Sequence, residues 1–385
     1  MEEKDIIKEE EVVPCPEDNE PDFKYEPNPK LPRWSKILYA IAAVAAVIFV
    51  ISTISPRFSD FYARYVGSIF RGVLATLTNW IPFSLAEGLI LLMPILAAAA
   101  VVWANKRYTE TWRQVFCFIG MGLSVASIFF SLFAFGFGPG YHGTGLDEKL
   151  GVERKEVSAA DLRHTAEILV QLVNENAESL TFNAQGQAIM PYSYNQMSEK
   201  LVKAYSSLAD VHSFIPRLSS RVKPVMLSEP WTYTHIAGVY TYFTGEANIN
   251  TNFPDYTLPY TAAHEMAHQR GIAREDEANF VAFLVCMQSD DAYIRYSGAL
   301  NLYEYVANAL YVADREAYVE FYTQLSAHAR LEMSAYSAFF EKYVDSTAST
   351  VTGAVNDAFL KLQGTEGTAS YGFVVDIAVA YFREK

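Results

Sequence analysis

Two histidines and a glutamate form the part of this sequence best suited to chemistry. His264 and His268 are four residues apart, and Glu265 directly follows the first histidine. If residues 258–270 form a helix, both imidazoles lie on one face, where they can bind the same metal ion. Glu265 then lies beside that ion, within reach of a water molecule bound to it. The spacing therefore predicts a metal site with its own carboxylate base.

A second acidic segment follows after a short gap. Gly271 can end the first helix, because glycine adopts the left-handed conformation that ends many helices. In the predicted second helix, Glu275 and Asn279 share one face with small alanines, so the two helices can approach closely. We expect Glu275 to supply an oxygen ligand and Asn279 to hydrogen-bond a ligating histidine. Glu277 remains an alternative ligand, and a charged first turn stabilised by the helix dipole is the competing interpretation.

Two imidazoles and one carboxylate are typical of a catalytic Zn²⁺ site, which keeps a fourth position open for water. Glu265 would accept the proton of that water as it attacks a substrate carbonyl, and would pass the proton to the leaving amine. Tyr371, or as second choice His235, is predicted to stabilise the negative charge that develops on the carbonyl oxygen. The competing interpretation is that each of these two is a packed surface side chain.

These motifs resemble those of a known class of enzymes. His264-Glu265-x-x-His268 with Glu275-x-x-Ala278-Asn279 resembles the gluzincin metallopeptidases, in which two histidines and a glutamate from the next helix bind zinc. In that class an Asp or Asn follows the glutamate ligand by four positions, and this match favours Glu275 over Glu277. The resemblance implies a zincin-like (gluzincin) domain and the hydrolysis of peptide bonds.

The chain as a whole resembles an uncharacterised bacterial membrane family, known as domain of unknown function 3810. Three short sequence segments carry this resemblance, at residues 242–248, 263–269 and 370–372. It covers nearly everything after residue 34. It implies several membrane spans combined with a zinc centre of this kind.

Three apolar stretches are long enough to cross a bilayer. They predict a bundle of three transmembrane helices within residues 34–138, with spans at about 37–55, 83–105 and 114–138. Residues 58–80 are expected to form an amphipathic helix, because Arg71 near its centre would be costly in lipid. A fourth span at this position is the alternative.

Basic residues flank the predicted spans on one side of the membrane. They precede the first span and lie between the second and third, at positions Lys30, Arg33, Lys36, Lys106, Arg107 and Arg113. Because lysine and arginine concentrate in cytoplasmic segments, both groups should be cytoplasmic. The chain after Gly138 is then expected outside the cytoplasm of a bacterial cell, as part of a multi-pass membrane protein.

The net charge of −14 belongs partly to an acidic tail. Residues 1–33 contain eleven acidic and five basic side chains as well as six prolines, which predicts a disordered cytoplasmic segment. The sequence has no basic patch, so nucleic acid is not an expected partner. Its three cysteines suggest no disulfide pair.

Residues 139–385 are expected to form one helix-rich α+β domain, so the fold class is mainly α. Helices are predicted at 159–174, 193–208, 281–287, 300–313, 315–340 and 351–362. Residues 239–250 alternate and are rich in tyrosine, threonine and phenylalanine, which indicates a strand or hairpin. A strand just before the histidine helix could bind an extended substrate through backbone hydrogen bonds.

These patterns together predict a membrane-anchored, zinc-dependent metallopeptidase that acts on peptides or proteins, with Glu265 as general base. The alternative is a non-catalytic membrane sensor or scaffold with a structural zinc. The intact Glu265 argues against this alternative, because a structural zinc does not need that carboxylate. The partners expected are a peptide or protein substrate and the lipid bilayer, while the oligomeric state stays open.

Overall fold

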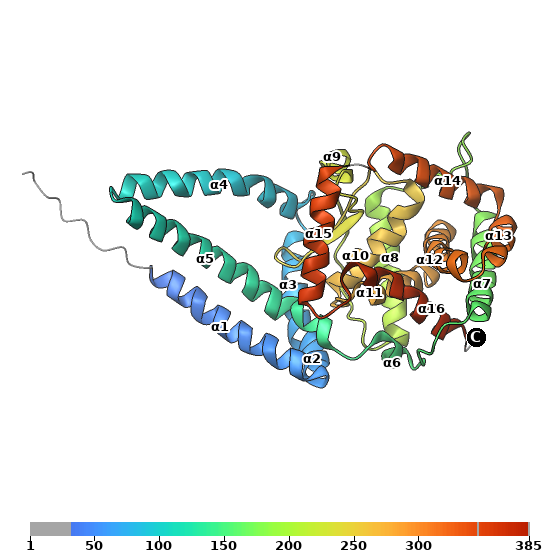
Figure 1. The fold of residues 1–385 in the computed structure, drawn as a ribbon, viewed down its shortest axis with the longest axis horizontal. Coiled ribbons are helices and arrows are strands. Elements are labelled where there is room, and N and C mark those ends of the chain that lie inside the picture. Colours follow the sequence, from blue (N-terminus) through green and yellow to red (C-terminus); the bar gives the residue numbers. More distant parts are fainter. Residues whose placement is uncertain (1–31, 345, 384–385) are drawn as a thin grey trace, which may run out of the picture.

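The structure, a computed structural model, describes residues 32–344 and 346–383. It consists of an elongated arm of three long helices and a helix-rich globular body (Figure 1). The predicted acidic tail, residues 1–33, lies almost wholly outside the described residues. Within the part that is described, the chain is mainly helical with one small sheet, as the sequence predicts.

The arm consists of three helices whose length and composition would allow them to cross a membrane. Their mean hydropathies are 2.7, 2.3 and 2.2, and they are α1 (Arg33–Ile54), α4 (Leu85–Arg107) and α5 (Thr111–Gly136). They match the three predicted spans within a few residues. At most 17% of the most apolar window in each helix is buried inside the protein. The exposed apolar side chains are therefore available to lipid.

The segment predicted as one amphipathic helix, 58–80, is divided into three consecutive pieces. These are α2 (Pro56–Phe61), the π-helical turn η1 (Tyr62–Gly67) and α3 (Ser68–Thr78). Arg71 of α3 is buried against the body and donates hydrogen bonds to the carbonyl oxygens of Gly136 and Arg270. Its charge is thus satisfied by protein groups, and none of these pieces is among the candidate spans found in the described chain.

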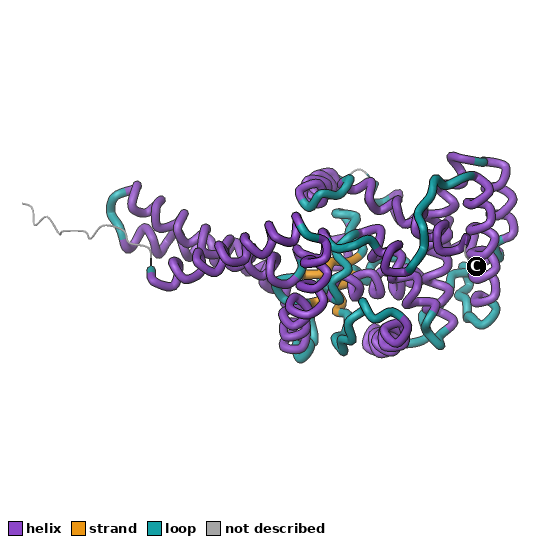
Figure 2. The backbone as a smooth tube through the Cα atoms, turned by 90° about the horizontal axis from the view of Figure 1, so that it is seen from below, coloured by secondary structure: helices purple, strands orange, loops and turns teal. Residues whose placement is uncertain are grey.

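A three-stranded sheet lies where the arm joins the body (Figure 2). Its strands are β1 (Lys223–Pro224), β2 (Gly238–Thr241) and β3 (Glu246–Ile249), in the order β1-β3-β2. Strands β2 and β3 are antiparallel and form the hairpin predicted for residues 239–250. Strand β1 runs parallel to β3 on the other side.

Helices form the rest of the body. In chain order they are η2 (Gly138–His142), α6 (Leu146–Leu150), α7 (Ala159–Ala177), α8 (Tyr194–Val211), α9 (Ser228–Thr232), η3 (Asp255–Thr257), α10 (Leu258–Gln269), α11 (Glu275–Met287), α12 (Ala292–Ala313), α13 (Arg315–Gln324), α14 (Ala327–Glu341), α15 (Thr347–Leu362), η4 (Gly367–Phe373) and α16 (Val374–Arg383). The single helix predicted at 315–340 is wrong. Helix α13 ends at Gln324, and Ser326 caps the following helix, α14, by accepting a hydrogen bond from the Ala329 N–H.

Helices α10 and α11 lie in the centre of the body. Every residue of α10 is buried, as is every residue of α11 except the last. Helices α12 and α8 pack around them, and the sheet packs against α10. Polar side chains inside such a core are costly unless they are paired or bind a ligand.

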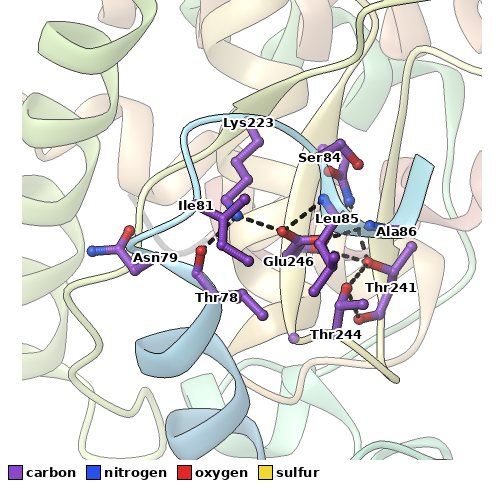
Figure 3. A network of polar contacts seen from close by, with 12 residues as sticks. Thr78, Asn79, Ile81, Ser84, Leu85, Ala86, Lys223, Thr241, Thr244 and Glu246 are labelled. Carbon is purple, nitrogen blue, oxygen red and sulfur yellow. Dashed lines mark hydrogen bonds and ion pairs between the residues drawn. The ribbon is translucent and has the colours of Figure 1, made fainter. Parts of the chain in front are cut away.

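A buried ion pair fastens the arm to the sheet (Figure 3). The Glu246 carboxylate of β3 pairs with the Lys223 ammonium of β1, and both side chains are almost fully buried. Glu246 also accepts the backbone N–H groups of Leu85 (3.1 Å) and Ala86 (2.9 Å) at the start of α4. Lys223 donates to the Thr78 carbonyl oxygen, at 2.7 Å. One carboxylate thus caps a candidate membrane span and holds it on the sheet.

Replacing Glu246 by glutamine should destabilise the protein by roughly 3–5 kcal/mol, because the Lys223 charge stays buried without its counter-ion. We expect a clearly lower unfolding temperature for the full-length protein in detergent. A double variant, Glu246→Gln with Lys223→Met, should recover part of the loss because it also removes the stranded charge. An unchanged unfolding temperature for the single variant would contradict this account of the junction.

Candidate metal centre

Helix α10 places the two histidines of the motif on one face. It starts with Pro259 in its first turn, where the missing N–H of proline costs nothing. One helical turn separates His264 from His268, and their ring centroids are 4.6 Å apart. Both side chains are buried. The sequence predicts this helix at 258–270, one residue longer than the structure shows.

A tight reversal at Gly271 brings α11 back against α10. Gly271 has a φ of 94°, and a methyl group there would overlap the Arg71 guanidinium. Such a backbone conformation favours glycine. The reversal places the Ile272 carbonyl oxygen 2.7 Å from His268 Nδ1. Because a carbonyl only accepts, His268 carries its proton on Nδ1 and leaves Nε2 free to bind a metal.

The third potential ligand is Glu275, the first residue of α11. Its Oε2 atom lies 3.2 Å from His264 Nε2 and 3.4 Å from His268 Nε2. Zinc bonds of about 2.0–2.2 Å at tetrahedral angles would hold ligand atoms roughly 3.4 Å apart. Both distances from the carboxylate to the imidazoles therefore match those around a zinc ion, and all three potential ligand atoms lie within 4.8 Å of one another, so the residues present fit such an ion.

Buried charge also favours a cation at this position. Burial alone would raise the pKa of Glu275, but His268 and His264 hold it well below its usual range. Burial lowers the pKa of His268, yet the Glu275 charge outweighs this and raises it to about 9. The carboxylate thus requires a positive partner, which in the metal-free protein is a proton on His268. A divalent cation would provide that charge and displace the proton.

The other acidic residue considered as a ligand points elsewhere. Glu277 Oε1 accepts the backbone N–H of Leu146 at 2.9 Å and lies 3.6 Å from Arg274 Nε. Asn279 also differs from expectation, because its amide donates to the Tyr305 hydroxyl at 3.4 Å rather than to a histidine. The Ile272 carbonyl oxygen orients His268 instead. Sequence spacing does not reveal this contact.

Glu265 lies beside this cluster and is buried. Burial raises the pKa of its carboxyl to about 7, although the two histidines act in the opposite direction. A carboxylate with such a pKa can both accept and release a proton near neutral pH. A Cβ atom on Gly238 of β2 would come within 2.7 Å of Glu265 Oε1, so only glycine leaves room for this side chain.

A cleft of about 460 Å³ opens onto His264 and Glu265. Residues 234–238, just before and at the start of β2, form one wall, and α12 contributes Asn301 and Tyr305. Helix α15 forms another wall with four small or polar side chains, Ser349, Thr352, Gly353 and Asn356. A substrate can therefore reach the side of the cluster that Glu265 occupies.

The residues predicted to stabilise negative charge have different positions. Tyr371 lies in η4, and its side chain is outside the described part of the structure. His235 lines the cleft, but its Nε2 donates to the Tyr343 carbonyl oxygen at 2.8 Å. Tyr305 lines the same cleft and was not predicted. Burial, followed by the Glu275 charge, raises its pKa to about 12, so it stays a neutral hydroxyl donor.

In a comparison with known families, residues 62–379 match the model described as "Protein of unknown function (DUF3810)". The chain belongs to this family. The match starts later than residue 34, where the resemblance was expected to begin, and it includes the whole candidate metal centre of this DUF3810 protein. No curated protein and no solved structure matches the chain.

Two neighbouring glutamates provide a test of the third ligand. The Glu275→Gln variant of this DUF3810 protein should bind zinc at least about tenfold more weakly, because a neutral amide replaces the anionic ligand. Glu277→Gln, on the same helix turn, should retain zinc. Chelator competition followed by metal analysis measures both affinities. Equal zinc affinity in the two variants would exclude Glu275 as a ligand.

Proposed function

We propose that this protein is a membrane-anchored zinc metallopeptidase with a gluzincin-type centre. The observation that supports this most strongly is the convergence of His264, His268 and Glu275 at the separations expected around zinc. Glu265 lies beside them at the edge of a cleft, as a peptidase requires. Zinc bound here would supply Lewis-acid activation of a water molecule and of the substrate carbonyl.

The protein groups around the cluster can carry out the proton transfers. The Glu265 carboxylate would accept a proton from the attacking water and donate it to the leaving amine, which its pKa of about 7 permits. The Tyr305 hydroxyl would donate a hydrogen bond to the substrate carbonyl oxygen as negative charge develops. Strand β2, next to Glu265, would hold the substrate backbone in an extended conformation.

The arm suggests on which side of the membrane this reaction takes place. The start of α1 and the turn between α4 and α5 lie at the end of the arm away from the body (Figure 1). Basic side chains gather at this end, at Arg33, Lys36, Lys106, Arg107 and Arg113. Because such residues favour the cytoplasmic side, we propose that the arm crosses the membrane three times and that the body is extracytoplasmic.

The Glu265→Gln variant should retain zinc and lose at least about a hundredfold in peptide hydrolysis, since general acid–base catalysis contributes about 10²–10⁴ in rate. Cleavage of a peptide library by the zinc-loaded full-length protein measures this. Glu304→Gln, a change of a half-buried glutamate outside the cleft, is the control. Zinc binding without any Glu265-dependent cleavage would contradict the proposal and favour a sensor or scaffold.

The Tyr305→Phe variant should lower kcat/KM by about 10²-fold while zinc content is unchanged, because one donor to the developing oxyanion is lost. In the wild-type protein the pKa of Tyr305 is about 12, so the hydroxyl remains protonated below that pH. Tyr305 itself should therefore cause no alkaline loss of activity. Tyr303→Phe is the matched control, because Tyr303 is a buried tyrosine that does not line the cleft. Equal activity of the two variants would exclude Tyr305 from this role.

A further inference from the structure

A pocket of about 240 Å³ at the junction between the arm and the body is lined by three arginines. Arg71 of α3 and Arg270, which follows α10, are almost fully buried, whereas Arg64 of η1 is exposed. Asp60 is the only acidic residue that lines the pocket in the described part of the chain, and it forms an ion pair with Lys149, at 3.2 Å. These two charges cancel, so the three arginine charges remain in excess. We call this site the cationic pocket.

The two buried arginines have no acidic partner. Arg71 and Arg270 donate their hydrogen bonds to backbone carbonyl oxygens, and neither forms an ion pair within the described residues. In that same part of the chain, the Nε atom of each is buried without a hydrogen-bond acceptor.

The carbonyl oxygens offset the charge of Arg71 only in part. Two of them belong to Gly136 and Arg270, at the ends of α5 and α10, where the helix dipole is negative. Burial nevertheless lowers the pKa of Arg71 to about 10, so its charged form is less stable here than in water. An anion in the pocket would supply the missing counter-charge.

The cationic pocket lies at the body ends of two candidate spans. Helix α1 ends at Ile54, and Ser59 of α2, the next helix, lines the pocket (Figure 1). Helix α5 ends at Gly136, and Gly140 of η2 lines it as well. In a bilayer, the polar headgroups extend roughly 5–8 Å beyond the hydrocarbon on each side. If the arm crosses the membrane, the pocket therefore lies at the level of the headgroups.

We propose that the cationic pocket binds a phosphate group. Guanidinium groups suit phosphate, because their N–H donors can bind two of its oxygen atoms at once. The position of the pocket favours the headgroup of an anionic phospholipid as the source, rather than a free phosphate ion. A zwitterionic phospholipid fits less well, because its ammonium group would add a positive charge beside the three arginines. This inference does not depend on the proposed peptidase function.

Lipid binding is measured on the full-length protein, purified in a neutral detergent and stripped of lipid. Native mass spectrometry follows its titration with phosphatidylglycerol, which is anionic, or with phosphatidylcholine, which is zwitterionic. We expect one phosphatidylglycerol to bind at least about tenfold more tightly than phosphatidylcholine, the change that one charge-assisted hydrogen bond would produce.

A second measurement uses inorganic phosphate alone. A ligand that binds the folded protein raises its unfolding temperature, so this temperature is recorded with increasing phosphate. Chloride at the same ionic strength is the control, because it reproduces the general screening of charges.

Two exposed arginines separate the pocket from general attraction to anions. Arg64→Gln removes a charge that lines the pocket and should weaken binding of phosphatidylglycerol by about tenfold. Arg57→Gln makes the same change on α2, at a residue that does not line the pocket, and should bind as the wild type does. Both side chains are exposed, so neither substitution should prevent folding.

The two measurements distinguish the sources of the phosphate group. Selective binding of phosphatidylglycerol, weakened by Arg64→Gln but not by Arg57→Gln, would support the site and a lipid source. Stabilisation by phosphate that Arg64→Gln reduces, without a preference for phosphatidylglycerol, would support the site and assign it to a free ion. Equal affinity for both lipids together with equal effects of phosphate and chloride would overturn the proposal. Equal losses of affinity in the two variants would overturn it as well.

Discussion

The reversal at Gly271 connects the candidate metal centre of this protein with the arm of three apolar helices. Its positive φ lets α11 return along α10, so that Glu275 meets the two histidines. The same turn supplies the Ile272 carbonyl oxygen that orients His268. Arg71, from the segment between the first two candidate spans, donates to the Arg270 carbonyl oxygen at the end of α10. A cation at a helix C-terminus is favourable, so the arm stabilises the helix that carries both histidines.

Buried charges hold the arm and the body together at three places: Arg71, the Lys223–Glu246 pair, and Glu87. Each of these charged side chains forms hydrogen bonds with backbone groups of a segment distant in the sequence. These bonds define one arrangement of the arm relative to the body. Apolar contacts alone would allow the helices of the arm to slide, whereas misplaced buried charges would lose their partners at a cost of several kcal/mol. The distance between the candidate spans and the candidate metal centre is consequently fixed by the junction.

The sequence predicts the features that depend on local periodicity, and it misses those that depend on distant contacts. The histidine helix, the hairpin and three apolar helices follow from spacing and composition, so the structure contains them within a few residues. The break at Ser326 was missed because the apolar pattern continues across it. Tyr305 could not be chosen among 25 tyrosines, since only the packing of α12 against α11 brings it to the cleft. The role predicted for Tyr371 stays a prediction, because its side chain lies outside the described part of the structure.

The geometry of β2 has a consequence for selectivity. Backbone pairing with residues 234–238, which line the cleft, would accept almost any extended sequence, and the small and polar wall of α15 offers few features that would select a side chain. Under the proposed function, the lining of the cleft would therefore impose little preference for particular residues of a peptide.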